Sequence, residues 1–318
     1  MTSSTSAGGP PDRVVEGWQS LRDVLADAQR RLTAAGVPSP EADASLLAAH
    51  VLGVPRGRLY LQDPMPNDQR MAFERLLSRR VARVPLQHLL GSAPFRTIEL
   101  SVGPGVFVPR PETELVAGAA IDALRALPAA DRVAVDLCTG SGAIAIALAV
   151  ELDGVRVTAV EIDPAAARWA RTNAERYAEA AGARGGSVRI VDADATRCAA
   201  PGAPLADLAG TAAVVVMNPP YVPDGAVVRD PEVREHDPAR ALYGGPDGLR
   251  VIRGAIDTAA VLLRPGGQVV VEHSDEQGDN AGDDGVPGLL RTDSRWRDVT
   301  DHLDLARRPR FTTATRSA

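Results

Sequence analysis

Hydrophobic residues recur with a helical period in the N-terminal part of the chain. One helical face is formed by residues three or four positions apart, namely Leu21, Val24, Leu25, Ala28 and Leu32. The pair Ser39-Pro40 opens a second helix. A third helix is marked by Met71, Leu76 and Leu77. The pattern predicts a small helical domain over residues 13–91, and the Ser-, Thr-, Gly- and Pro-rich residues 1–12 before it are expected to be a disordered tail.

The period changes beyond residue 110, where short apolar runs alternate with helical segments. These runs have strand length and span residues 133–137, 155–160, 187–191, 212–217 and 269–272. Strands that alternate with helices predict an α/β fold, here a Rossmann-like doubly wound sheet over residues 111–318. Residues 94–108 alternate loosely around Gly103-Pro104-Gly105, which predicts a β-hairpin with its turn there, within a linker over residues 92–110. The Gly- and Asp-rich segment 275–288 is expected to be a loop or a poorly ordered insertion.

A glycine-rich loop follows the first strand of the predicted sheet. It reads Cys138-Thr139-Gly140-Ser141-Gly142, and an apolar helical run begins at Ala143. A strand, a glycine turn and a helix N-terminus form a nucleotide-type binding site at the carboxyl edge of a parallel sheet. The loop lacks the Gly-Lys-Ser/Thr ending of a Walker loop, and Ala145 stands where the G-x-G-x-x-G fingerprint has its third glycine. A purely structural tight turn is the alternative.

Two acidic residues follow the next strands along the chain. Glu161 ends the second strand, about 20 residues after the glycine loop, where folds of this type place the acid that binds both ribose hydroxyls. Asp194 follows the third strand and is a candidate for binding an adenine amino group. A solvated strand-end acid is the alternative for Glu161, and a cap or turn role is the alternative for Asp194.

The fourth strand, residues 212–217, ends in Asn218-Pro219-Pro220-Tyr221. Each proline fixes its own φ and lacks an N–H, so this corner is stiff and rich in hydrogen-bond acceptors. The Asn218 side-chain oxygen and the Pro219 carbonyl can accept both hydrogens of one planar NH2 group, and the Tyr221 ring offers a face for stacking. Such a corner suits an enzyme that alkylates a conjugated, weakly nucleophilic NH2 group. An ordinary strand-ending turn is the alternative.

The order and spacing of these four strand ends resemble those of class I S-adenosylmethionine-dependent methyltransferases. Four further motifs make the chain similar to the HemK/PrmC family, the glutamine methyltransferases of peptide-chain release factors. These motifs are Val108–Glu114, Gly244–Leu249, Leu263–Gln268 and Asp304–Phe311. The resemblance runs from about residue 15 to the end of the chain.

The resemblance implies a role for each matching residue. The methionine part of S-adenosylmethionine would lie against Cys138, Thr139, Gly140, Ser141 and Gly142. Glu161 would bind the ribose, and Asp194 with Ala195 would lie beside the adenine. The substrate glutamine would be bound by Asn218, Pro219, Pro220 and Tyr221, with Asn218, Pro219 and Tyr221 as the catalytic group and Asn218 also beside the cofactor. The N-terminal helical domain would recognise class I release factors, and no metal is expected.

The sequence departs from the family pattern at a few positions. Cys138 replaces a common glycine, so the loop has to accept a side chain there, and Ala195 replaces a bulky aromatic beside the adenine. Ser274 replaces a glycine, and Arg96-Thr97 replaces an aromatic-glycine pair in the hairpin. None of these positions lies in the Asn-Pro-Pro-Tyr corner, so we still expect activity.

Composition narrows the function classes further. All 35 basic residues are arginine, which removes Schiff-base and P-loop lysine chemistry. The net charge of −6 argues against a protein that mainly grips a phosphate backbone, so no direct DNA binding is expected. Cys138 and Cys198 lack metal-ligand spacing, and the five histidines are scattered. No apolar run approaches membrane-spanning length, and we expect a cytoplasmic monomer without a membrane partner.

Several other polar residues allow more than one interpretation. A basic face on one predicted helix, formed by Arg75, Arg79, Arg80 and Arg83, is either a partner-docking surface or an ordinary solvated face. Arg110 and Glu112 are expected to pair structurally, with a direct role at the substrate as the alternative. His273 is expected to be a packed or solvent-facing strand-end residue rather than a base.

The sequence as a whole predicts a methyltransferase that modifies the glutamine in the Gly-Gly-Gln loop of class I release factors. Two enzymatic alternatives are a ribosomal-protein glutamine methyltransferase and an adenine amino-methyltransferase acting on nucleic acid, because glutamine and adenine both present a planar conjugated NH2 group. A third alternative is a binding module that keeps the cofactor fold without turnover. The acidic charge and the helical N-terminal domain favour a protein substrate.

Overall fold

The computed structural model describes residues 20–62 and 64–318. The chain divides into two compact units, Met1–Leu89 and Leu90–Ala318. The tail expected over residues 1–12 lies outside the described residues.

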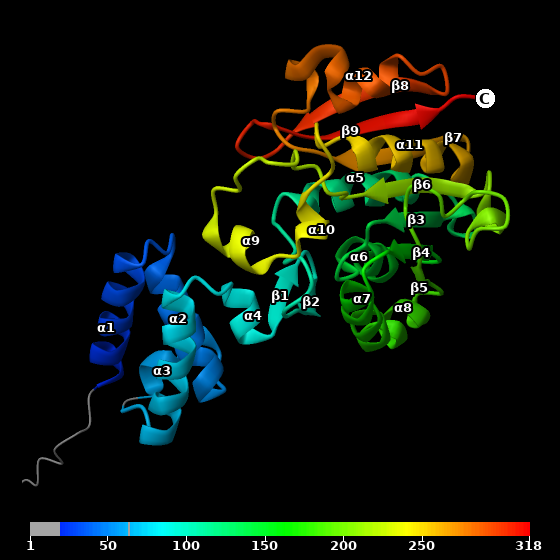
Figure 1. Ribbon diagram of the computed structural model, residues 1–318. Helices are drawn as coiled ribbons and strands as arrows, with labels where there is room; N and C mark the ends of the chain where they lie inside the picture. Colours follow the sequence, from blue (N-terminus) through cyan, green and yellow to red (C-terminus); the bar gives the residue numbers. More distant parts are fainter. Residues whose placement is uncertain (1–19, 63) are drawn as a thin grey trace, which may run out of the picture. The chain divides into compact units, whose positions relative to one another are not determined.

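The smaller unit is helical. Its helices are α1 (Leu21–Ala34), α2 (Pro40–Leu52), η1 (Arg56–Leu61) and α3 (Asn67–Val81), and α4 (Leu86–Leu90) follows them (Figure 1). The Ser20 side chain accepts a hydrogen bond from the Asp23 N–H and so caps α1. The core side chains are fully buried and include Leu32, Leu47, Phe73 and Leu77. The Met71 side chain is 65% exposed, although the sequence used it to mark this helix. The buried hydrophobic side chain in the first half of α3 is that of Phe73.

Two of the four arginines that the sequence assigned to a basic face bind within the helical unit instead. The Arg80 side chain is buried, and its Nε donates to Asp43 Oδ2 at 2.7 Å. Arg83 lies beyond the end of α3, and its Nη1 donates to the carbonyls of Ala35 and Gly36. Neither interpretation of the four arginines, a docking surface or a solvated face, therefore applies to Arg80, because its buried guanidinium is paired with Asp43.

The larger unit begins with a two-stranded antiparallel hairpin, β1 (Ser92–Phe95) and β2 (Ile98–Ser101). Its turn lies at Arg96-Thr97, so the predicted turn at Gly103-Pro104-Gly105 is wrong. The Arg96 side chain donates two hydrogen bonds to Glu151, at 2.8 and 2.7 Å, which fixes this turn against the end of α6 (Ala143–Glu151). Gly103 instead packs directly against the Trp169 ring, where a Cβ would come within 2.7 Å.

A seven-stranded sheet forms the centre of the larger unit (Figure 1). Its strands are β3 (Val133–Leu137), β4 (Arg156–Glu161), β5 (Ser187–Asp192), β6 (Ala212–Met217), β7 (Leu263–Glu272), β8 (Trp296–Leu303) and β9 (Pro309–Arg316). They lie in the order β5-β4-β3-β6-β7-β9-β8. The five neighbouring strands β5, β4, β3, β6 and β7 are parallel to one another. Strand β9 runs antiparallel to both β7 and β8. The predicted α/β doubly wound fold is confirmed.

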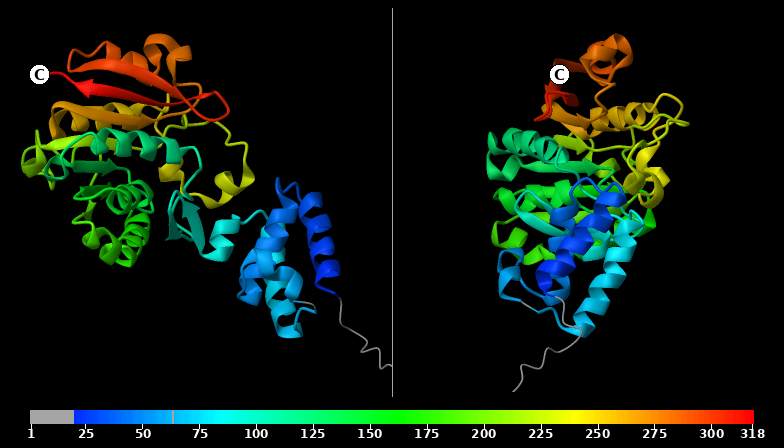
Figure 2. Two further views of the ribbon diagram at one scale, coloured as in Figure 1. Left: turned by 180° about the vertical axis from the view of Figure 1, so that it is seen from behind. Right: turned by 90° about the vertical axis from the view of Figure 1, so that its left-hand side faces the viewer.

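Helices cover both faces of the sheet (Figures 1 and 2). One face is covered by α5 (Thr113–Arg125), α6 (Ala143–Glu151), α7 (Pro164–Arg176) and α8 (Ala178–Ala183), and the other by α11 (Arg250–Leu262) and α12 (Val286–Arg291). Within β7, Val270 packs on the first face and Val269 and Val271 on the second, as the alternation of a strand requires. The connections hold η2 (Ala129–Asp131), η3 (Ala206–Leu208), α9 (Pro231–His236), α10 (Ala239–Leu242) and η4 (Asp279–Asp284).

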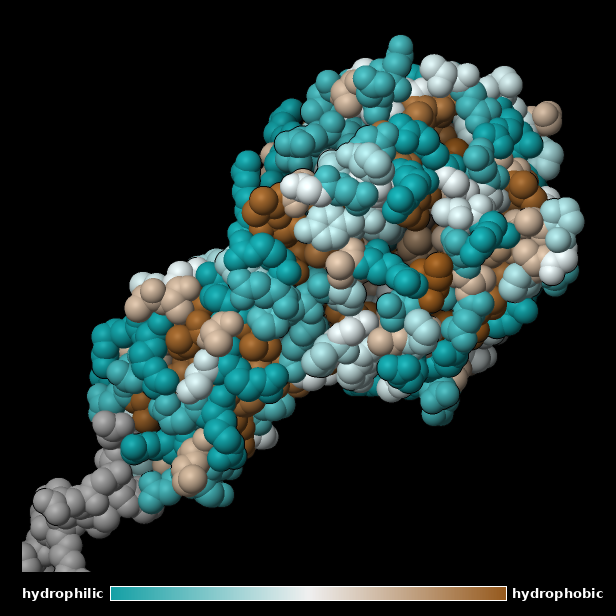
Figure 3. Space-filling view, viewed as in Figure 1, coloured by the Kyte–Doolittle hydropathy of each residue, from teal (hydrophilic) through white to brown (hydrophobic). Residues whose placement is uncertain are grey.

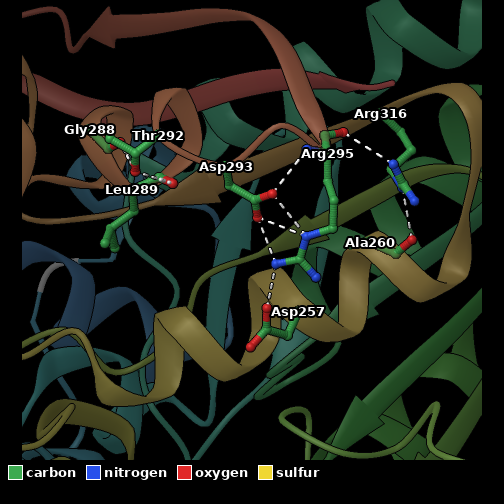
Figure 4. Close-up of polar contacts among 8 residues, drawn as sticks. All are labelled: Asp257, Ala260, Gly288, Leu289, Thr292, Asp293, Arg295 and Arg316. Carbon is green, nitrogen blue, oxygen red and sulfur yellow. Dashed lines mark hydrogen bonds and ion pairs between the residues drawn. The ribbon is translucent and has the colours of Figure 1, made fainter. Parts of the chain in front are cut away.

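The segment 275–288, expected to be a loop or an insertion, contains η4 and the start of α12. Beyond α12, Arg295 joins separate elements (Figure 4). Its guanidinium binds Asp293 at 2.6 Å and Asp257 of α11 at 2.6 Å. The Arg316 side chain at the end of β9 donates to the carbonyls of Arg295 and Ala260. These contacts attach the two antiparallel strands to α11.

Most of the surface seen in Figure 3 is hydrophilic, and hydrophobic atoms lie in separate places between polar ones. Among residues 20–62 and 64–318, no helix has both the length and the apolar character needed to cross a membrane.

Candidate active site

The carboxyl ends of β3 and β6 lie side by side in the middle of the sheet. From β3 the chain continues outward to β4 and β5, and from β6 it continues in the opposite direction to β7. The strand order therefore reverses between β3 and β6, and open α/β sheets bind their ligands at such a point. A cavity of about 1350 Å³ lies at this edge.

The glycine loop after β3 forms one wall of the cavity. Cys138, Gly140 and Gly142 all have positive φ, at 63°, 57° and 85°. No atom lies within 4 Å of the position that a Cβ on Gly140 would take, so its backbone faces open space. Gly142 has a different role, because it packs against Ile146 of α6 and Ala170 of α7 and does not line the cavity.

Asp136, the fourth residue of β3, stabilises the glycine loop through side-chain hydrogen bonds. Its Oδ2 accepts hydrogen bonds from Thr139 Oγ1 at 2.5 Å and from the Ala145 N–H at 3.1 Å. Burial raises the pKa of Asp136 to about 7. The loop is therefore preformed by contacts that need no ligand.

Glu161 lies at the end of β4, next to the glycine loop. Its Oε2 accepts from the Gly140 N–H at 2.9 Å, and its Oε1 accepts from the Ile162 and Asp163 N–H groups at 2.9 and 2.8 Å. Burial raises the pKa of this carboxyl, and the three backbone hydrogen bonds act in the opposite direction. Glu161 lines the cavity, where its remaining lone pairs can accept hydrogen bonds from two neighbouring hydroxyls.

Asp194 and Ala195 line the same cavity beyond β5. Asp194 Oδ1 accepts hydrogen bonds from the Thr196 N–H and hydroxyl, at 2.9 and 2.7 Å, and Oδ2 lies 3.3 Å from Arg197 Nε. The turn role considered for Asp194 is therefore present in the structure. It leaves room for a ligand contact at this residue, because a carboxylate has more lone pairs than these partners use.

The Asn-Pro-Pro-Tyr corner forms the opposite wall. Asn218, Pro220 and Tyr221 line the cavity, whereas Pro219 is not among its lining residues. Asn218 Nδ2 donates to Thr113 Oγ1 at 3.2 Å. Burial raises the pKa of Tyr221, so its phenol stays neutral at physiological pH.

The backbone of the corner is supported from behind by the glycine-rich motif that the sequence placed after it. A Cβ on Gly244 would lie 2.4 Å from the Pro220 carbonyl oxygen, and one on Gly248 would lie 2.2 Å from the Tyr221 carbonyl oxygen. Only glycine allows this approach. The motif therefore fixes the path of the corner backbone rather than binding a ligand through side chains.

Sequence reasoning missed several residues of the cavity. Phe107, Arg110, Glu272 and Arg310 line it together with the predicted residues. Arg110 does not pair with Glu112 as expected: its Nη2 donates to Asp237 Oδ2 at 2.8 Å, and its guanidinium lies 4.9 Å from the centre of the Phe107 ring. The sequence did hold one signal for this part of the cavity. Aromatic residues make up only 3% of the chain, and one of them, Phe107, stands directly before the Val108–Glu114 motif. Asp237 is 127 residues from Arg110, so only the fold reveals that pair.

His273 is fully buried beside this site, so it is packed rather than facing solvent. Its ring nitrogens lie 2.8 Å from the Ser274 carbonyl oxygen and 2.9 Å from Thr312 Oγ1. In the part of the chain that the structure describes, no group of three or more His, Cys, Asp or Glu side chains is arranged to hold a metal ion.

Comparison with known proteins identifies two domains. Residues 23–91 match the PrmC N-terminal domain, and residues 99–232 match the methyltransferase small domain. The chain is 48% identical to a release factor glutamine methyltransferase of Streptomyces coelicolor, over 92% of this chain and 97% of the relative. It is also 48% identical to one of Mycolicibacterium smegmatis, over 94% and 98%. A 4-amino-L-phenylalanine/4-methylamino-L-phenylalanine methyltransferase of Streptomyces pristinaespiralis is 41% identical, over 87% and 89%.

Proposed function

Because this chain belongs to the family of release factor glutamine methyltransferases, we propose that its β3–β6 cavity is where a release-factor glutamine is methylated. The protein is an S-adenosylmethionine-dependent protein-glutamine N-methyltransferase. One observation carries the assignment of the site: a single cavity joins the glycine loop and Glu161 to the Asn-Pro-Pro-Tyr corner. A methyl donor and a planar NH2 group can meet there.

The residues on the glycine-loop side fit S-adenosylmethionine. The open backbone at Gly140 accommodates close approach of the methionine part, and Cys138, Thr139 and Ser141 line the same wall. The Glu161 carboxylate would receive the two ribose hydroxyls, and Asp194 with Ala195 would lie beside the adenine. When bound, S-adenosylmethionine supplies an electrophilic methyl group on a sulfonium ion.

Chain residues on the other side orient the substrate amide. A carboxamide nitrogen is a poor nucleophile because its lone pair is delocalised into the carbonyl. The Asn218 side-chain oxygen and the Pro219 carbonyl accept its two N–H groups, and Tyr221 packs against the amide plane. Because positive charge develops on nitrogen during transfer, fixed acceptors stabilise the transition state as well as position the nucleophile.

Pro219 enters this scheme through its backbone. The carbonyl oxygen of Pro220 faces Gly244, and that of Tyr221 accepts a hydrogen bond from Gln277. The Tyr221 carbonyl is therefore used within the protein, and we assign the second acceptor beside Asn218 to the Pro219 carbonyl.

The two units divide the work. We assign residues 13–91 to recognition of class I release factors, residues 92–110 to the connection, and residues 111–318 to catalysis. The match of residues 23–91 to the PrmC N-terminal domain supports the first assignment. The net charge of −6 supports a protein substrate rather than DNA, and we propose a cytoplasmic monomer.

A second candidate substrate is an aromatic amine such as 4-amino-L-phenylalanine. It is favoured by the relative from Streptomyces pristinaespiralis, whose similarity to this chain spans most of both proteins. An aniline nitrogen is also planar and conjugated, so the acceptors of the corner alone do not exclude it.

Methyl transfer to defined acceptors separates these functions. Purified protein is incubated with methyl-labelled S-adenosylmethionine and, separately, a class I release factor, the same factor with its Gly-Gly-Gln glutamine changed to alanine, a ribosomal protein fraction, duplex DNA and 4-amino-L-phenylalanine. We expect label on the intact factor alone. Label on 4-amino-L-phenylalanine or DNA but not on the factor would overturn the proposal.

A further inference from the structure

Glu272 is a buried carboxylate at the substrate side of the cavity, and the reaction scheme above does not use it. It is the last residue of β7 and is 2% exposed. Met217 of β6 and Val271 of β7 are paired in parallel register, so Asn218 and Glu272 leave neighbouring strands at the same level. Glu272 lines the cavity, and its Oε2 has no hydrogen-bond partner within the described residues.

Three side chains from separate parts of the chain meet here. Asn218 Nδ2 donates to Thr113 Oγ1 at 3.2 Å. Burial raises the pKa of the Glu272 carboxyl, and the neighbouring Thr113 and Asn218 side chains act in the opposite direction. An ionised carboxylate only accepts hydrogen bonds, so the end of the Asn218 amide that faces Glu272 is its NH2 group.

This arrangement decides which way the Asn218 amide faces. Its nitrogen donates to Thr113 and is placed on the side of the neighbouring Glu272 carboxylate, so its oxygen is the atom left for a ligand. The reverse orientation would place the amide oxygen against the carboxylate and would present NH2 to the NH2 group of the substrate. Both contacts would be repulsive, and a buried polar group without a partner is costly.

We propose that Glu272 is a positioning residue that, together with Thr113, holds the Asn218 amide with its oxygen directed at the substrate NH2 group. The inference rests on the proposed function, because it concerns the acceptor for the substrate amide. Glu272 acts through Asn218 and gives the site its preference for an NH2 donor.

Protonation of Glu272 would remove its preference for one orientation of the Asn218 amide. Burial raises the pKa of Glu272 to about 7, against the effect of Arg310, whose positive charge lowers it. The other ionisable groups that face it are Glu112 before α5 and Tyr221 after β6. Below its pKa, Glu272 becomes a hydrogen-bond donor and competes for the Asn218 oxygen. Turnover is therefore expected to fall as the pH drops through about 7.

The test compares Glu272→Gln with the pair Thr113→Ser and Thr113→Val in the full-length protein. Each variant is titrated with S-adenosylmethionine to show that the cofactor site is intact. Competition then measures affinity for a release factor and for its Gln→Met variant, a neutral side chain of similar length without N–H donors. The pH profile of kcat is measured from pH 6 to pH 9.

We expect Glu272→Gln to reduce the preference for glutamine over methionine by about tenfold and to remove the acid limb of the kcat profile. A tenfold change corresponds to the loss of about one hydrogen bond's free energy. Thr113→Ser should keep the wild-type preference, and Thr113→Val should lose part of it. If Glu272→Gln fails to bind the cofactor, the comparison of Thr113→Ser with Thr113→Val still tests the inference.

Two results would overturn the inference in distinguishable ways. Wild-type preference and an unchanged acid limb in Glu272→Gln, with equal behaviour of the two Thr113 variants, would show that Glu272 does not act through Asn218. A wild-type protein that shows no preference for glutamine would overturn the proposed function itself.

Discussion

The side chain of Gln277 donates a hydrogen bond from Nε2 to the backbone carbonyl of Tyr221 at 3.1 Å. The other end of the same amide, Oε1, accepts from the Ser274 N–H at 3.2 Å. Gln277 thus connects the loop after β7 to the corner after β6. The Asn-Pro-Pro-Tyr corner is therefore supported by a residue that follows a different strand.

Gln277→Glu is expected to weaken this support selectively, because it keeps an acceptor for Ser274 and removes the donor to Tyr221. We predict a decrease in kcat of about tenfold, the effect of roughly one lost hydrogen bond. The dissociation constant for S-adenosylmethionine should stay within about twofold, measured by calorimetry. A variant with wild-type kcat would show that Gly244 and Gly248 alone hold the corner.

Asn218→Ala is expected to affect turnover far more than cofactor binding. In the proposed scheme it removes an acceptor for the charge that develops in the transition state, so kcat should fall by about 100-fold to 1,000-fold. Cofactor affinity should change little, because the proposed cofactor contacts are mainly those of the glycine loop and Glu161. Single-turnover methyl transfer with a release factor measures the first quantity, and near-normal turnover would disprove the role of Asn218.

Cys138 adopts φ +63°, a conformation that costs a non-glycine residue about 1–2 kcal/mol. Cys138→Gly relieves this strain but adds freedom to the unfolded chain, which offsets about 0.5–1 kcal/mol. We expect its unfolding free energy to equal or exceed that of the wild type by up to about 1 kcal/mol. Urea unfolding without cofactor measures it.

Cys138→Val is the matched variant, because a β-branched side chain is strongly disfavoured at positive φ. It should be less stable than Cys138→Gly by about 2 kcal/mol or more. Equal stability of the two variants would mean that the loop changes conformation to accept a side chain.

The buried ion pair Arg80–Asp43 is expected to govern the stability of the helical unit. Asp43→Ala leaves the Arg80 guanidinium buried without its carboxylate, which costs about 3–5 kcal/mol. Asp27→Ala is the control, since its side chain is 48% exposed and its pair with Arg30 should contribute less than about 1 kcal/mol. Thermal unfolding followed by circular dichroism compares them, and similar losses would contradict the assignment of a special role to the buried pair.

Much of the site was predictable because its residues follow strands. A parallel sheet brings the carboxyl ends of its strands to one edge, so Gly140, Glu161, Asp194 and Asn218 had to lie near one another once their strands were identified. Gly142 and Pro219 show the limit of this reasoning. They stand within the right motifs, yet Gly142 packs into the protein and the Pro219 residue is not part of the cavity lining.

The sequence by itself determined the two kinds of periodicity, the order of the strands along the chain and the loops that follow them, because each depends on residues close together in the chain. Only the tertiary structure decided that the hairpin turns at Arg96-Thr97, that Arg80 binds Asp43, and that Asn218 donates to Thr113, 105 residues away. It also decided that Glu272 lies buried beside Asn218. These pairings depend on how helices and strands pack, and a buried polar group takes whichever partner that packing brings within hydrogen-bonding distance.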